Sequence, residues 1–229
     1  MSLIAARSAM VGGGGKGGVS IIDSVFTNAT QYSSNWTTSY PYVGAYIDTG
    51  YKVNPQTTIE VECGWNEYQA QSWDSPIGSG ANGVWNGSLV AIFPKWDHPM
   101  NPYGSLLNKS YAESGSVSLQ APTEIIRFLL GPQDGFKFWT ESGTLLYSEN
   151  PKTPPSSGAK YSLYIGATNY GGTMVNPMIG RIRRVTLSEN GTTVKNYLSA
   201  KFEGVCGFFE TVGGVFSSSE SSIAFTEVA

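Results

Sequence analysis

The chain has few charged residues, two cysteines and a single histidine. Lys, Arg, Asp and Glu make up 14% of its 229 residues, and the formal net charge is −3. Such a chain has no general attraction to nucleic acid or to an anionic membrane, so we expect neither as a partner. Two cysteines and one histidine cannot complete a tetrahedral zinc site, and the aspartates form no calcium loop. We therefore expect no metal and no cofactor.

Long apolar runs are also missing. The longest, around residues 125–130, fall short of the roughly 20 residues that span a bilayer, so we expect no transmembrane helix. The first eleven residues lack a basic start, and Arg7 interrupts the apolar stretch that a secretory signal needs. We do not expect export by that route. Cys63 and Cys206 make no disulfide framework, and the sequence favours buried free thiols over a pair.

Glycine, proline and aromatic residues are plentiful. The sequence holds 28 Gly and 12 Pro, and 13% of its residues are aromatic. This composition is typical of many short strands joined by turns. The clearest strand is Thr57–Trp65, in which apolar and polar residues alternate as in a half-buried antiparallel strand. Its two faces are Ile59, Val61, Cys63 and Trp65, and Thr58, Glu60 and Glu62.

A hairpin is predicted near the C-terminus. The β-rich runs Ile182–Leu187 and Val194–Leu198 flank Asn190-Gly191, and both of these turn residues tolerate positive φ. The alternation breaks near Arg183-Arg184, which predicts a β-bulge. Further strand candidates are Ser88–Phe93, Ser116–Leu119, Thr123–Leu130, Gly135–Trp139, Thr144–Tyr147 and Tyr161–Thr168. These strands predict an all-β fold with two antiparallel sheets in a jelly-roll sandwich, with a closed barrel as the alternative.

Six segments between about Tyr46 and Phe225 resemble a known family. They are Tyr46-Ile-Asp-Thr-Gly-Tyr-Lys52, Thr57-Thr-Ile-Glu-Val-Glu62, Tyr164-Ile-Gly-Ala-Thr-Asn169, the C-terminal hairpin, Gly204-Val-Cys-Gly-Phe-Phe209 and Gly214-Val-Phe216. In their order they resemble the concanavalin A-like lectin/glucanase (laminin-G-like) domains found in phages and prophages of gut bacteria. The resemblance implies a concanavalin A-like β-sandwich over residues 24–229. It also implies a non-enzymatic bacteriophage virion protein, a head fibre or a capsid decoration, located on the virion surface.

Residues 1–23 differ in composition from the rest of the chain. Gly12–Gly18 contains six glycines and one lysine, the composition of a flexible linker. Such a run has no side chains with which to order itself, so we expect a neighbouring subunit or a larger assembly to hold it. We predict an N-terminal anchoring arm that docks on capsid or tail proteins, and a homo-oligomer, first of all a trimer. The predicted anchoring residues are Leu3, Ile4, Arg7, Met10, Gly12, Gly13, Gly14, Gly15 and Lys16.

Aromatic and polar residues cluster outside the clear strands. An aromatic ring stacks on the apolar face of a sugar, while carboxylates and amides bind its hydroxyls. The pattern permits binding of host or mucus glycans, although the same rings could instead close the ends of the sandwich or fill a subunit interface. The predicted site is Trp73, Asp74, Trp96, Asp97, His98 and Tyr103.

Glu60 and Glu62 lie on one strand face and raise the question of hydrolysis. Glycoside hydrolases use two carboxylates beside the scissile bond. The Glu-x-Asp-x-x-Glu pattern of the glucanases is absent here, and His98 has no partner for a catalytic role, so we do not expect an enzyme. A tail receptor-binding protein, a bacterial glycan-binding module and a divergent glycoside hydrolase remain as alternatives, in that order.

Overall fold

The chain forms strands and turns. The computed structural model describes residues 18–27, 29–30, 43–65, 75–80, 90–93, 103–107, 109–111, 124–153 and 156–228. Within these ranges there is no helix, and hence no helix that could cross a membrane. The prediction of an all-β fold is confirmed for this part of the chain, and the predicted strand Ser116–Leu119 lies outside it.

The largest sheet has eleven strands, all paired antiparallel. At one end its order is β13-β12-β11-β6-β17. Its strands are β1 (Ser20–Ile21), β2 (Val25–Thr27), β6 (Thr57–Trp65), β11 (Ile126–Gly131), β12 (Gly135–Thr140), β13 (Leu145–Glu149), β17 (Gly180–Glu189), β18 (Thr192–Phe202), β19 (Val205–Glu210), β20 (Val215–Ser218) and β21 (Phe225–Glu227).

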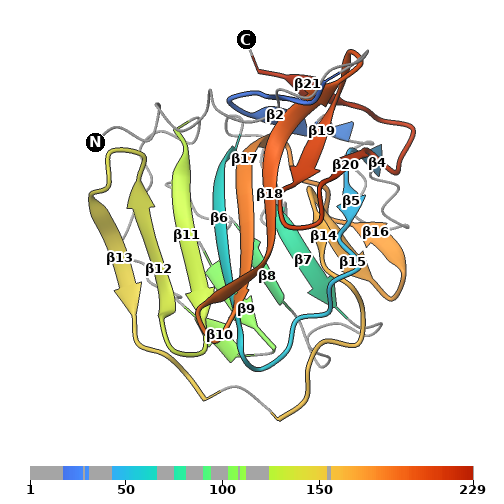
Figure 1. Ribbon diagram of the computed structural model, residues 1–229. Coiled ribbons are helices and arrows are strands. Elements are labelled where there is room, and N and C mark those ends of the chain that lie inside the picture. Colours follow the sequence, from blue (N-terminus) through green and yellow to red (C-terminus); the bar gives the residue numbers. More distant parts are fainter. Residues whose placement is uncertain are drawn as a thin grey trace.

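Smaller sheets lie behind the large one (Figure 1). The five-stranded sheet has the order β16-β15-β7-β14-β5 and the three-stranded sheet the order β10-β9-β8, while two short strands form a separate pair. Their bounds are β3 (Ala29–Thr30), β4 (Val43–Gly44), β5 (Ile47–Asp48), β7 (Ile77–Gly80), β8 (Val90–Phe93), β9 (Tyr103–Leu106), β10 (Lys109–Tyr111), β14 (Tyr164–Ile165), β15 (Thr168–Tyr170) and β16 (Thr173–Val175).

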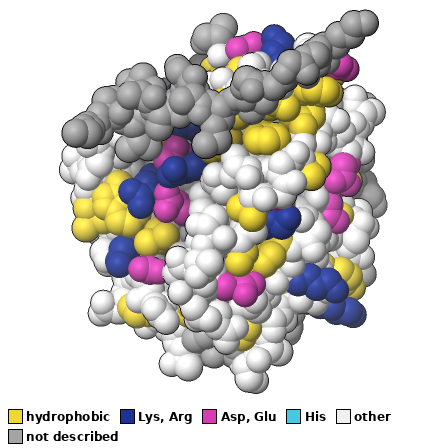
Figure 2. All heavy atoms as spheres, in the orientation of Figure 1, with side chains coloured by type: hydrophobic (Ala, Val, Ile, Leu, Met, Phe, Trp, Pro, Cys, Tyr) yellow, Lys and Arg dark blue, Asp and Glu magenta, His cyan; other side chains and the backbone are white. Residues whose placement is uncertain are grey.

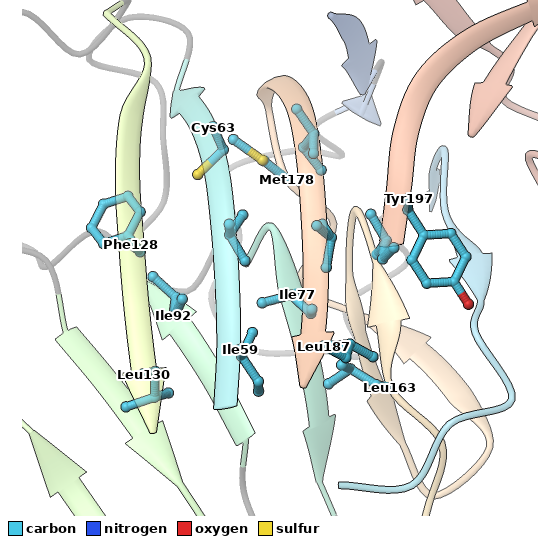
Figure 3. Close-up of a cluster of buried hydrophobic side chains, with 14 of the residues drawn as sticks. Ile59, Cys63, Ile77, Ile92, Phe128, Leu130, Leu163, Met178, Leu187 and Tyr197 are labelled. Atoms are coloured by element: carbon cyan, nitrogen blue, oxygen red, sulfur yellow. The ribbon is translucent and has the colours of Figure 1, made fainter. Parts of the chain in front are cut away.

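The hydrophobic core is shared by the large sheet and the sheets behind it. The predicted inward face of β6 is confirmed, because Ile59, Val61, Cys63 and Trp65 are each at most 1% exposed. Figure 3 shows Ile59 and Cys63 of this face together with Ile77, Ile92 and Leu163 from the segments behind the large sheet. Cys63 and Cys206 are buried free thiols, as predicted. Burial, followed by the charge of Glu62, raises the pKa of the Cys63 thiol, which therefore stays protonated.

The hairpin and the bulge are confirmed in detail. Asn190 and Gly191 have φ of 49° and 80°, as a tight two-residue turn between β17 and β18 requires. The register between β17 and β6 shifts between Ile182 and Arg184, which places the bulge at Arg183. One edge of β17 follows β6 along its length, while its other partners are β2 through Gly180–Ile182 and β18 through Arg184–Glu189.

The large sheet closes on itself at one end. This differs from the predicted sandwich, in which both sheets would be open. Strands β17, β18, β19, β21 and β2 pair in a ring, with Cys206 opposite Phe225 in the β19–β21 link. The ring forms because β17 pairs with both β2 and β18. The Ser199 hydroxyl donates to the Ile182 carbonyl oxygen at 2.6 Å, and the rings of Phe208 and Phe225 meet edge to face at 5.3 Å. This end of the molecule is barrel-like.

One pairing in the five-stranded sheet is parallel, so the expectation of purely antiparallel sheets is wrong. Strand β14 pairs antiparallel with β7, and β15 pairs parallel with it. The chain turns between them at Gly166, whose φ is 89° and whose N–H donates to the Pro76 oxygen at 2.8 Å. A side chain at Gly166 would also collide with the Ala45 carbonyl. The predicted strand Tyr161–Thr168 is therefore two short strands.

The turn between β19 and β20 is held by a buried carboxylate. Glu210 is 3% exposed and accepts the N–H groups of Val212 and Gly213 at 2.8 Å each. Lys195 Nζ lies 3.3 Å from its carboxylate. Burial by itself raises the pKa of Glu210, but the backbone N–H groups and then Lys195 outweigh it and lower this pKa below its ordinary value.

The aromatic part of the core predicts one large loss of stability. The Phe128 ring lies 5.6 Å from Trp65, 6.1 Å from Phe136 and 5.4 Å from Phe138, measured between centroids. We expect Phe128→Ala to lower the free energy of unfolding by about 3 to 5 kcal/mol, because it leaves a cavity that these rings cannot fill. Leu145→Ala, at a side chain 52% exposed, should change it by about 0.5 kcal/mol or less. Urea unfolding measures both, and equal small losses would contradict this packing.

The carboxylate of Glu210 predicts a pH-dependent contribution. Because its pKa is lowered in the folded chain, its charge stabilises the fold above the unfolded-state pKa of about 4.3. That contribution is lost as the pH falls through the folded-state pKa. We expect Glu210→Gln to cost about 1 to 3 kcal/mol at neutral pH and much less in acid. Urea unfolding across pH measures this, with Glu203→Gln on an exposed turn as the control, and a pH-independent cost would refute it.

Candidate functional site

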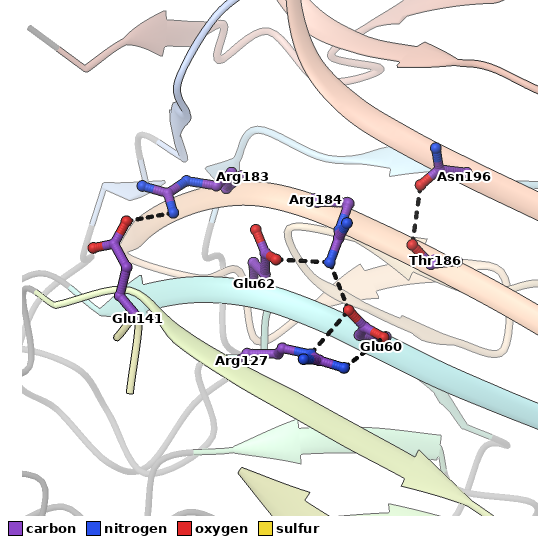
Figure 4. Close-up of polar contacts among 8 residues, drawn as sticks. All are labelled: Glu60, Glu62, Arg127, Glu141, Arg183, Arg184, Thr186 and Asn196. Atoms are coloured by element: carbon purple, nitrogen blue, oxygen red, sulfur yellow. Dashed lines mark hydrogen bonds and ion pairs between the residues drawn. The ribbon is translucent and has the colours of Figure 1, made fainter. Parts of the chain in front are cut away.

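The outward face of β6 carries the two glutamates that raise the possibility of hydrolysis. Figure 2 shows basic and acidic side chains alternating over β6 and β11. Arg184 Nη2 lies 2.6 Å from Glu60 Oε1 and 2.7 Å from Glu62 Oε1, so one nitrogen bridges both carboxylates (Figure 4). Arg127 Nε lies 3.1 Å from Glu60 Oε1 on the other side.

This arrangement is an ion-pair network that links three strands. Arg127, Glu60 and Arg184 come from β11, β6 and β17 in turn. The register sets Arg127 and Arg184 on either side of Glu62, and Glu60 is two residues away on the same face of β6, within reach of both arginines. In a glycoside hydrolase the space between the two carboxyl groups holds the scissile bond or the attacking water. Here Arg184 occupies that space. The geometry of this face therefore adds no support to the hydrolase alternative.

Most residues of the two predicted sites lie outside the described part of the chain. This is so for Trp73, Asp74, Trp96, Asp97 and His98, and for every predicted anchoring residue from Leu3 to Lys16. Tyr103 is described: it is partly buried on β9, opposite Phe93 of β8.

Strand β1 lies within residues 1–23, the predicted arm. It pairs with the large sheet, because Ser20 and Ile21 lie opposite Lys201 and Ala200 of β18.

A different group of aromatic and acidic side chains meets where β5 pairs with β14. The register sets Tyr164 opposite Asp48 and Ile165 opposite Ile47. Ile47 and Ile165 are buried in the core. Because neighbouring residues on a strand face opposite sides, Tyr46, Asp48 and Tyr164 lie on the outward face of this sheet. The rings of Tyr46 and Tyr164 stack with their centroids 4.7 Å apart and their planes at 25°.

Hydrogen bonds fix the carboxylates beside the ring pair. Asp48 accepts the Gly50 N–H at 2.8 Å and the Ser162 hydroxyl at 2.9 Å. Glu220 Oε1 accepts the Asp48 backbone N–H at 2.6 Å, and the Glu220 backbone N–H donates to the Tyr46 carbonyl oxygen at 2.9 Å. Asp48 and Glu220 are exposed, while Tyr46 is partly exposed over the buried Tyr164. We call Tyr46, Asp48, Ser162, Tyr164 and Glu220 the tyrosine–carboxylate cluster.

The surroundings keep the two phenols protonated. Burial, followed by the charge of Asp48, the neighbouring Tyr46 and the charge of Glu220, raises the pKa of Tyr164 to about 12. Burial, then Glu220 and then Asp48 raise the pKa of Tyr46 as well. Protonated phenols keep their hydrogen-bond donors. The cluster thus combines an aromatic ring face, two hydroxyl donors and two carboxylate acceptors.

A buried polar group lies in the same row of the sheet as Tyr164. Gly78 of β7 is opposite both Tyr164 and Thr168 in the sheet, so these residues form a row. A side chain at Gly78 would collide with the Thr168 hydroxyl. Thr168 is 2% exposed, and its hydroxyl has no hydrogen-bond partner among the described residues. No group of three or more metal-ligating side chains occurs in those residues either.

The sequence did not single out the cluster as a site. Its segments around Tyr46 and Tyr164 indicated a family resemblance and, for Tyr161–Thr168, a strand, but no binding site. The local signal was the spacing of Tyr46 and Asp48, which puts both on one strand face. Glu220 comes from a turn near the C-terminus and carries no such signal. Only the pairing of β5 with β14 and the return of the C-terminal segment bring these residues together.

Comparisons with known proteins show only remote structural similarity. No protein-family model matches the chain, and no curated protein matches it in sequence. A solved structure of a mutant NanB sialidase from Streptococcus pneumoniae is similar with a TM-score of 0.46 and 15% identity, over 65% of this chain and 25% of that chain. This chain therefore spans a small part of the length of that sialidase. A similarity at this level does not identify the fold or the function.

Proposed function

We propose that this chain is a non-enzymatic bacteriophage virion protein, a head fibre or capsid decoration, that binds glycans through a concanavalin A-like jelly-roll sandwich. The observation that carries the binding function is the stacked pair of Tyr46 and Tyr164 beside the exposed carboxylates of Asp48 and Glu220. A sugar has an apolar ring face and a rim of hydroxyls. The cluster offers a complementary group for each.

The rigidity of the cluster supports a binding role. Tyr164 lies under Tyr46 and fixes the plane of its ring, and Asp48 is held by Gly50 and Ser162. A site that is already in place loses little side-chain entropy when a ligand binds. A single partly exposed ring gives weak affinity, which many copies on one particle raise by avidity.

The composition of residues 1–23 and the family resemblance support the virion role. Strand β1 fixes where the arm leaves the domain, beside Ala200 and Lys201 of β18. The glycine run before it has the composition of a linker that gives an arm reach. In this proposal the arm docks on capsid proteins, three copies assemble, and the sandwich is displayed on the virion surface.

Removal of the exposed ring tests the binding function. We expect Tyr46→Ala to weaken glycan binding by about tenfold, because an aromatic stacking contact is worth up to about 1.5 kcal/mol beyond the area that it buries. Trp139→Ala removes a partly exposed ring on the large sheet, over which Arg127 lies at 5.0 Å, and should leave binding unchanged. Glycan arrays followed by titration calorimetry measure both variants. Equal binding by wild type and Tyr46→Ala would place the glycan site elsewhere.

Removal of the arm tests the virion role separately. We expect a chain lacking residues 1–17 to retain its unfolding transition and its glycan binding, because β1 and the cluster remain. Particles assembled with this variant should lack the protein, as measured by mass spectrometry of purified particles. Normal incorporation of the truncated chain would contradict anchoring by the arm.

Turnover of a bound glycan that is lost in Glu60→Gln would instead show a hydrolase.

A further inference from the structure

The two carboxylates of the cluster differ from most others in the structure. Glu60, Glu62, Glu149, Glu210 and Glu227 each form an ion pair with a Lys or Arg side chain, and so do Asp23 and Glu141. Asp48 and Glu220 are exposed, and in the described ranges their hydrogen-bond donors are all uncharged. The cluster therefore carries two negative charges that no described cation neutralises.

These charges determine which ligands can approach Tyr46. We propose that the tyrosine–carboxylate cluster selects uncharged glycans and rejects glycans that carry a carboxylate or a sulfate at the bound residue. This inference rests on the proposed glycan-binding function and narrows its ligand class. An acidic group of a ligand that sits about 5 Å from both Asp48 and Glu220 is repelled by each carboxylate. The two repulsions together disfavour an acidic sugar by about tenfold or more at low salt.

Uncharged sugars also match the hydrogen-bonding groups of the cluster. Carboxylates accept hydrogen bonds only, and sugar hydroxyls donate them. One oxygen of Glu220 receives the Asp48 N–H, which aligns the carboxylate next to Tyr46. The cluster thus supplies acceptors for sugar hydroxyls, and its carboxylates form no ion pair with a described Lys or Arg side chain.

The test compares two glycans that differ only by a terminal acidic sugar. The full-length chain is titrated with a neutral oligosaccharide and with its sialylated form, at low and at physiological salt. We expect at least about tenfold tighter binding of the neutral form at low salt, with a smaller ratio as salt screens the charges. Equal or tighter binding of the sialylated form, with or without calcium, would overturn the inference.

The double variant Asp48→Asn/Glu220→Gln removes the charges and keeps the shape. Both amides retain an oxygen for the Gly50 and Asp48 N–H groups, so the fold should persist. We expect this variant to lose the discrimination against the sialylated form. Glu124→Gln, an exposed glutamate before β11, is the matched control and should keep it. A double variant that still discriminates would contradict the role of these two carboxylates.

The two proposals fail in different ways. If the wild-type chain binds neither glycan, the proposed glycan-binding function is wrong, and the inferred preference for uncharged glycans falls with it. If it binds both with equal affinity and loses both in Tyr46→Ala, the glycan site stands and the charge selection is wrong.

Discussion

The pairing of β6 with β17 is the interaction on which the rest of the structure depends. Nine residues of β6 lie along β17, and the two strands place Ile59, Val61 and Val185 in the core. On the opposite face the same pairing sets Arg184 against Glu60 and Glu62. One ladder thus carries both the hydrophobic packing between the layers and the ion pairs that cover the outer surface.

The bulge at Arg183 explains how an open sheet becomes barrel-like at one end. An extra residue bends a strand and increases its twist. After the bulge, β17 changes its second partner from β2 to β18, and the ring through β19 and β21 closes. Arg183 itself binds Asp23 and Glu141, which ties the segment after β1 and the turn after β12 to this bend.

The tyrosine–carboxylate cluster depends on a second constraint, the sharp turn at Gly166. That turn carries the chain from one edge of β7 to the other and leaves Tyr164 between β5 and β7. Asp48 then faces Tyr164, and the C-terminal turn brings Glu220 to the same place. A site built this way is formed by strand ends and turns on a rigid sheet, as is common for binding sites.

The sequence predicts the elements whose signals are local. The alternation in Thr57–Trp65, the Asn190-Gly191 turn and the broken pattern at Arg183 each depend on residues a few positions apart, and each was predicted from the chain alone. The ring closure, the parallel β7–β15 pairing and the meeting of Tyr46, Tyr164 and Glu220 are seen in the folded chain and have no local signal in the sequence. The physical reason is that side-chain period and turn preference act within a strand or a turn. The choice of strand partners depends on the burial of the whole core, which no short segment encodes.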